Sequence, residues 1–142
     1  MDERAASPVA KWSDDWWRWP LVPVAAVAGL LAAWIAASAI MWLQMKFTGG
    51  FAEDGWYFRY IVPALASAAA GYGYSIAACM TAPRGHKFAG TAMVTLLAIV
   101  GVLSAAIAWT SGHYSVGQAI QTTVAAVVTQ AAAIAAVVSF EP

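Results

Sequence analysis

The sequence predicts an all-α integral membrane protein, built as a four-helix transmembrane bundle with a short amphipathic interfacial helix at its N-terminus. Hydrophobic residues make up 62% of the 142 positions and charged residues only 10%, whereas a soluble domain carries about 25% charge. A chain of this length cannot bury so much apolar surface within itself. In addition, four apolar stretches reach the roughly 20 residues that a helix needs to cross a bilayer.

The four predicted spans occupy residues 20–44, 56–82, 87–109 and 115–140. Together they form a transmembrane domain over residues 20–140, which follows a cytoplasmic tail over residues 1–19. Charged residues stay near the ends of the spans, with Arg59 one turn into the second and Lys87 opening the third. We predict helices because backbone groups in hydrocarbon must be paired within the segment, and because the spans lack the charged face of a water-soluble helix.

Tryptophans gather on one side of the N-terminal tail, where Val9, Trp12, Trp16 and Trp19 follow helical spacing. Charged residues fall largely on the other side. Because indole rings favour the membrane interface, we expect this segment to lie on the inner surface until Pro20 turns the chain inward. An ordinary aromatic belt on a polar tail is the alternative. The predicted interfacial anchors are Trp12, Trp16, Trp17 and Trp19.

The distribution of basic residues predicts the orientation of the spans. Most of them belong to the tail and to the loop between the second and third spans, namely Arg4, Lys11, Arg18, Arg84 and Lys87. The other side has only Lys46 and Arg59. Since cytoplasmic loops are enriched in Lys and Arg, we expect both termini to be cytoplasmic, in a bacterial inner membrane. The inner basic loop of Arg84 and Lys87 is interpreted as a topology signal, with binding of anionic lipid headgroups or of a partner's acidic loop as the alternative.

Small residues spaced four apart form ridges that allow helices to approach closely in a membrane. The predicted packing residues are Ala25, Gly29, Ala33 and Ala37 in the first span and Ser67, Gly71 and Ser75 in the second. A parallel row in the second span consists of Ala69, Gly73 and Ala77. Such rows also arise by chance in an alanine-rich chain. They therefore predict close packing without identifying a particular interface.

The fourth span carries polar side chains close to one helical face, at Gln118, Thr122, Thr129 and Gln130, with Gln121 nearby. Amides and hydroxyls in hydrocarbon join helices through hydrogen bonds worth about 1 kcal/mol each, and we favour this role. Lining a hydrated path is the alternative. Transport sites more often include an intramembrane ionisable residue, which these spans lack.

Tyr72, Tyr74 and Trp34 are aromatic residues that lie well inside the spans, away from their ends. Tyr72 and Tyr74 point to different sides of a helix, so one can bond inside the bundle while the other approaches a neighbouring subunit or a flat ring such as a quinone. Core packing is the alternative for both. Trp34 lies near mid-span, where its indole N–H needs a partner, and we expect it to face protein.

The sequence offers little chemistry for catalysis. His86 and His113 are expected at opposite membrane surfaces, roughly 30 Å apart, so they cannot share a haem or a metal ion. Cys79 is the single cysteine, and no nucleophile, base and orienting acid can be assembled. We therefore expect no enzyme activity, no cofactor and no metal site. A formal net charge of zero also argues against nucleic acid as a partner.

The hydropathy profile is similar to that of many small four-span proteins, including the small membrane subunits of tripartite carboxylate transporters and accessory chains of respiratory or photosynthetic complexes. This similarity covers the whole chain but rests on the number of spans, so it assigns no functional residue.

Nearly every feature concerns anchoring and helix contact, which favours a noncatalytic accessory or scaffolding subunit of a larger membrane complex. Its partners would be the lipid bilayer and either other membrane subunits or copies of itself. One alternative is a small transporter or channel component formed by self-association. Another is a quinone-linked or redox-linked membrane anchor subunit.

Overall fold

The computed structural model describes residues 16–48, 55–83 and 85–141. Within these ranges the chain is helical and contains no strand, and four helices are long and apolar enough to cross a membrane by length and composition. The all-α prediction is confirmed at this level. The elements in order are η1 (Trp16–Arg18), α2 (Leu21–Thr48), η2 (Tyr57–Ile61), α3 (Val62–Thr81), α4 (His86–Thr110) and α5 (Val116–Ser139).

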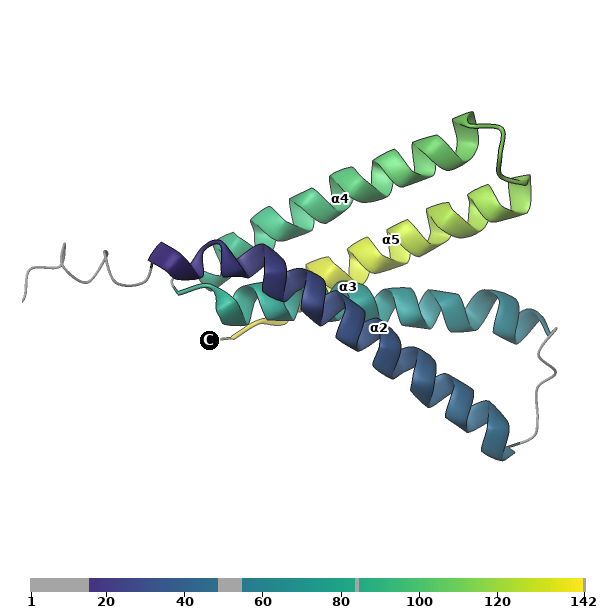
Figure 1. The fold of residues 1–142 in the computed structure, drawn as a ribbon, viewed down its shortest axis with the longest axis horizontal. Coiled ribbons are helices and arrows are strands. Elements are labelled where there is room, and N and C mark those ends of the chain that lie inside the picture. The colour runs from purple at the N-terminus through teal and green to yellow at the C-terminus, as the bar shows by residue number, and fades with distance from the viewer. Residues whose placement is uncertain (1–15, 49–54, 84, 142) are drawn as a thin grey trace, which may run out of the picture.

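Helix α3 occupies the centre of the arrangement. Helices α2 and α5 pack along it, whereas α4 packs mainly on α5 and less extensively on α3. The α2–α3 and α4–α5 hairpins lie together at the end that carries the C-terminus and diverge toward the opposite end, as Figure 1 shows. The four helices thus form a bundle that is splayed at one end.

The buried residues join the helices in two clusters. The first cluster connects α2, α3 and α4 and consists of Val22, Ala26, Tyr74, Ala78, Ala82, Ala89 and Met93. The second cluster connects α3, α4 and α5 and consists of Cys79, Val94, Ala133 and Val137. Four of the seven residues in the first cluster are alanines, and the second consists of small cysteine, valine and alanine side chains. The core therefore depends on close approach of the backbones more than on large side chains.

Glycines permit the closest contacts of α3 with its neighbours. A Cβ on Gly29 of α2 would lie 2.5 Å from the Cβ of Ala77 and 2.6 Å from the carbonyl oxygen of Gly73. On the α5 side of α3, a Cβ on Gly71 would overlap the carbonyl oxygen of Thr129. Helices that meet this closely need residues without side chains at the crossing point, as in other membrane helix pairs.

The structure leaves Trp34 on the surface of this chain. It was expected to face protein, but its side chain is 49% exposed on the surface of the chain. Helix α2 packs on α3 through the side that carries Ala26 and Gly29, and this contact leaves the indole outside. None of the other described helices covers it, and α2 contacts α4 only weakly.

Candidate functional site

The polar side chains of α5 have different roles. Gln118 lies in the first turn and is exposed. Its backbone N–H donates to the Ser115 hydroxyl at 3.3 Å, and the Ser115 N–H donates to Gln118 Oε1 at 2.9 Å. This reciprocal pair is a capping box, which satisfies backbone donors at a helix start. Gln118 therefore caps the start of α5, whereas it was expected to make a contact within the membrane.

The threonines of α5 bond within their own helix. The Thr122 hydroxyl donates to the carbonyl oxygen of Gln118 at 2.9 Å, and the Thr129 hydroxyl donates to that of Ala125 at 2.7 Å. Both are bonds to the preceding helical turn, which is an ordinary partner for threonine in a helix. Neither hydroxyl links α5 to another helix in these bonds.

Gln130 makes a bond between helices. Its Nε2 donates to the carbonyl oxygen of Val94 on α4 at 3.3 Å. Its other amide atom, Oε1, is buried and has no hydrogen-bond partner among the described residues. A buried acceptor without a partner costs about 1–3 kcal/mol. Gln130 thus connects α4 to α5 and retains one unused acceptor.

Gln121, which was not among the predicted contact residues, also bonds between helices. Its Nε2 donates to the carbonyl oxygen of Arg59 at 3.3 Å. Pro63, four residues after Arg59, has no N–H to offer this carbonyl, and a proline ring crowds the carbonyl one turn back. The chain takes a π-helical form over Tyr57–Ile61, just before this proline. The signal available in the sequence was a proline about two turns inside the predicted second span.

Trp109 and Thr123 form a second bridge between α4 and α5. The indole Nε1 of Trp109 donates to the Thr123 hydroxyl oxygen at 3.1 Å. The same hydroxyl donates to the carbonyl oxygen of Ala119 at 2.8 Å. Because it both accepts and donates, the Thr123 hydroxyl is engaged within the protein.

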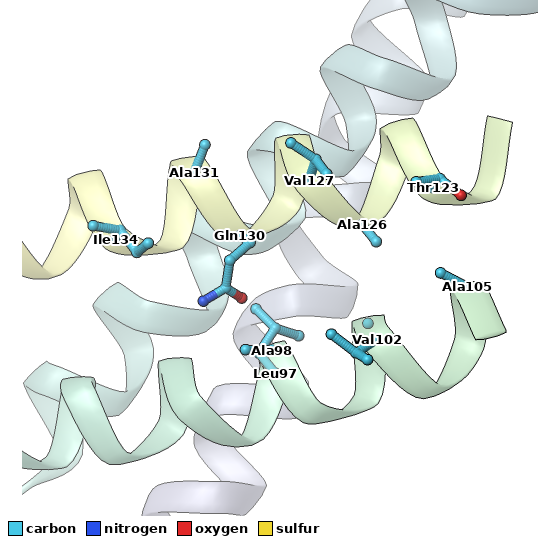
Figure 2. A pocket seen from close by; sticks show the side chains of 11 residues that line it. Leu97, Ala98, Val102, Ala105, Thr123, Ala126, Val127, Gln130, Ala131 and Ile134 are labelled. Carbon is cyan, nitrogen blue, oxygen red and sulfur yellow. The ribbon is translucent and has the colours of Figure 1, made fainter. Parts of the chain in front are cut away.

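An apolar groove of about 420 Å³ lies between α4 and α5. Its α4 wall extends over residues 97–105 and its α5 wall over residues 123–134. Small side chains such as Ala98, Ala105 and Ala126 leave space between the two helices, and the Gln130 amide points from α5 toward α4 beside this space (Figure 2). The polar lining side chains are those of Thr123 and Gln130. We take this groove as the candidate functional site.

The chain matches no family model. It also matches no curated protein and no solved structure. A proposal for its function therefore rests on the contacts and the groove described above.

The predicted packing rows lie on different interfaces. Ala25, Gly29, Ala33 and Ala37 are all half-buried, and a Cβ on Gly73 of α3 would lie 2.5 Å from that of Ala33. The row of α3 that meets α2 thus contains Gly73 and Ala77. In the other row, Gly71 faces α5. Ser67 is half-buried, and Ser75 is fully buried with a hydroxyl that has no hydrogen-bond partner among the described residues.

The two tyrosines of α3 have unequal environments. Tyr74 belongs to the first core cluster and is buried, whereas Tyr72 is 47% exposed. This is the arrangement expected for side chains two residues apart on a helix. Tyr74 therefore packs inside the chain, and Tyr72 remains available to a neighbour.

His86 connects the start of α4 to the end of α3 through a hydrogen bond. Its Nδ1–H donates to the carbonyl oxygen of Cys79 at 2.7 Å, and its ring lies 5.9 Å from that of Phe140 between centroids. Cys79 itself is buried. His113 lies in the turn after α4 and is exposed. In the ranges that the structure describes, no three His, Cys, Asp or Glu side chains gather where they could hold a metal ion.

The predicted anchors and the inner basic loop are only partly described. Trp16, Trp17 and Trp19 are exposed, the first two within the short 3-10 turn η1. Lys87 is exposed in the first turn of α4. Trp12 and Arg84 lie outside the described residues.

Proposed function

We propose that this chain is a noncatalytic accessory subunit of a larger membrane complex and that it acts through contacts of its helices with neighbouring subunits. The four apolar helices would cross the bilayer with both termini on the cytoplasmic side of a bacterial inner membrane. The positions of the basic residues support this orientation, since Arg18 and Lys87 lie at one end of the helices while Lys46 and Arg59 lie near the other.

Trp34 is the main support for a partner subunit. It lies in the middle of α2, is half exposed, and does not hydrogen-bond to any described residue through its indole N–H. Lipid tails contain no acceptor, and a polar group without a partner in hydrocarbon is costly. A neighbouring protein would supply both an acceptor and a packing surface for the ring.

The side of α2 around Trp34 supports the same role. Val27, Leu31 and Ile35 are each more than half exposed, and α2 packs almost entirely on α3. A helix with one partner in its own chain has room for a second partner from another chain. We therefore propose that the face formed by Val27, Leu31 and Trp34 contacts a different subunit.

Photocrosslinking from position 34 tests this proposal in native membranes. We would replace Trp34 by benzoylphenylalanine in the full chain, with the same replacement at Val100, an exposed residue of α4, as the control. The expected result is one protein adduct of defined mass from position 34, recovered with the chain in a fixed ratio in mild detergent. A chain that stays monomeric at every detergent concentration and gives only lipid adducts from position 34 would contradict the proposal.

The transport alternative is tested by the same purified chain. The bonding of Gln118, Thr122 and Thr129 within α5 and its cap supports an accessory role over a polar pathway along this helix. We expect liposomes containing the chain alone to show no solute flux above that of empty liposomes. Flux that is abolished by replacing Gln118 and Gln130 with Leu would favour a carrier or channel.

A further inference from the structure

We propose that the groove between α4 and α5 binds an uncharged, lipid-soluble molecule that carries a hydroxyl group. The ligand hydroxyl donates a hydrogen bond to Gln130 Oε1, and its apolar body fills the groove. This site is separate from the proposed subunit contact at Trp34, and neither depends on the other.

The hydrogen bonds of the lining residues determine which polar group the ligand needs. The Thr123 hydroxyl already accepts from Trp109 and donates to Ala119. The Gln130 Nε2 already uses one of its two N–H groups on the Val94 carbonyl oxygen. Among the polar side-chain atoms of the lining, Gln130 Oε1 is the one that makes no hydrogen bond with any described residue, and it is buried. An acceptor requires a donor, so the ligand must present an O–H or N–H group.

The depth of Gln130 in α5 excludes a charged headgroup. At 1.5 Å per residue, Gln130 lies about 21 Å from the start of α5 at Val116 and about 14 Å from its end at Ser139. Phospholipid headgroups stay at the membrane surface, and a charge at this depth is costly unless it is paired. The lining contains no charged side chain that would pair with it. A neutral hydroxyl satisfies the acceptor without this cost.

The dimensions of the groove favour a small molecule over a partner helix. The lining extends over about 12 Å of α4 and about 16 Å of α5, whereas a transmembrane helix of a partner is about 30 Å long. Such a helix would extend beyond the groove, past the Trp109–Thr123 bridge that joins α4 to α5. The volume of about 420 Å³ lies in the usual range of small-molecule pockets.

Two classes of lipid-soluble ligand carry a hydroxyl group on an apolar body. A long-chain or isoprenoid alcohol offers one hydroxyl on an apolar chain, and a hydroquinone offers hydroxyls on a flat ring. An oxidised quinone has only carbonyl acceptors at the same positions. The acceptor at Gln130 therefore favours a hydroquinone over the corresponding quinone.

Photolabelling with a matched pair of probes tests the donor requirement. We would incubate the purified full chain in nanodiscs with a diazirine-bearing tetradecanol or with its methyl ether and map the labelled peptides by mass spectrometry. The alcohol is expected to label residues 97–105 and 123–134 about fivefold more than the ether, the difference that one neutral hydrogen bond of about 1 kcal/mol produces. Equal labelling of the groove by the two probes would overturn the proposal.

Three variants locate the effect. Ala98→Phe fills the groove and is expected to abolish labelling there, while Val100→Phe, at an exposed position of α4 that does not line the groove, is expected to leave it unchanged. Gln130→Leu is expected to keep labelling but lose the preference for the alcohol. Labelling that persists in Ala98→Phe would also overturn the proposal, and this result does not require the Gln130 variant to fold.

Competition distinguishes the two sources. Excess unlabelled tetradecanol or excess hydroquinone is added to the labelling reaction with the wild-type chain. The competitor that suppresses labelling at the lower concentration identifies the class of ligand. An oxidised quinone that competes as well as its hydroquinone would contradict the role of Gln130 as an acceptor.

Discussion

Gly71 provides the sharpest test of the contact between α3 and α5. In Gly71→Ala, the new Cβ would overlap the Thr129 carbonyl oxygen and lie 2.9 Å from its carbonyl carbon. These are backbone atoms of a helix, so they cannot rotate away and the two helices must separate. Overpacking of this kind costs about 1–3 kcal/mol. Alanine also favours a helix by about 1 kcal/mol over glycine, which partly hides the cost.

Gly101→Ala is the matched control for this effect. A Cβ on Gly101 would lie 3.5 Å from that of Ala126, an ordinary contact distance, so this variant gains the same helix propensity without the overlap. The free energy of unfolding is measured for both in mixed detergent micelles by circular dichroism. We expect Gly71→Ala to be less stable than Gly101→Ala by about 1–3 kcal/mol. Equal stabilities would refute the close contact between α3 and α5.

Two further predictions concern hydrogen bonds between helices. Gln121→Leu is expected to lower the free energy of unfolding by about 1 kcal/mol, and by less in a Pro63→Ala background that restores a backbone N–H for the Arg59 carbonyl. Equal losses in the two backgrounds would contradict this role of Gln121. Trp109→Phe and Thr123→Ala are expected to show a coupling of about 0.6 kcal/mol in a double-mutant cycle, the average for such bonds in a membrane protein. Strictly additive effects would show that the bridge contributes nothing.

The helical spans were predictable because their cause is local. A stretch of about 20 apolar residues must pair its backbone groups internally, whatever its neighbours are. The π-helical turn before Pro63 was not predicted, because the length and hydropathy of a span do not specify the form of its backbone next to a proline. The interior of a span is thus easier to predict than the form of its first turn.

The helix contacts were only partly predictable. Small-residue rows on the second span share the same spacing, so spacing alone could not show that Gly73 faces α2 while Gly71 faces α5. That choice depends on how three helices pack around α3, which is a property of the whole chain. The mid-span position of Trp34 indicated that its indole N–H needs a partner. It could not show that the helices of this chain leave the indole exposed, because that depends on how α2 packs.

The polar residues of α5 show how a helix boundary changes an interpretation. Spacing grouped Gln118 with Thr122 and Thr129 as one face. The pattern from Ser115 to Gln118 is also that of a capping box. Because α5 begins at Val116, Gln118 belongs to this cap and not to a polar face within the span. The contact of Gln121 was not predicted, because it depends on where α5 packs beside the π-helical turn that contains Arg59.

Sidedness of labelling tests most directly whether these helices cross a membrane. Single cysteines are introduced as Lys87→Cys and Ser111→Cys in a Cys79→Ala background, at exposed positions flanking the two ends of α4. With a membrane-impermeant maleimide, we expect Ser111→Cys to react in intact cells and Lys87→Cys to react only after permeabilisation. Reaction of both cysteines in intact cells, or release of the chain from membranes by an alkaline wash without detergent, would contradict the account.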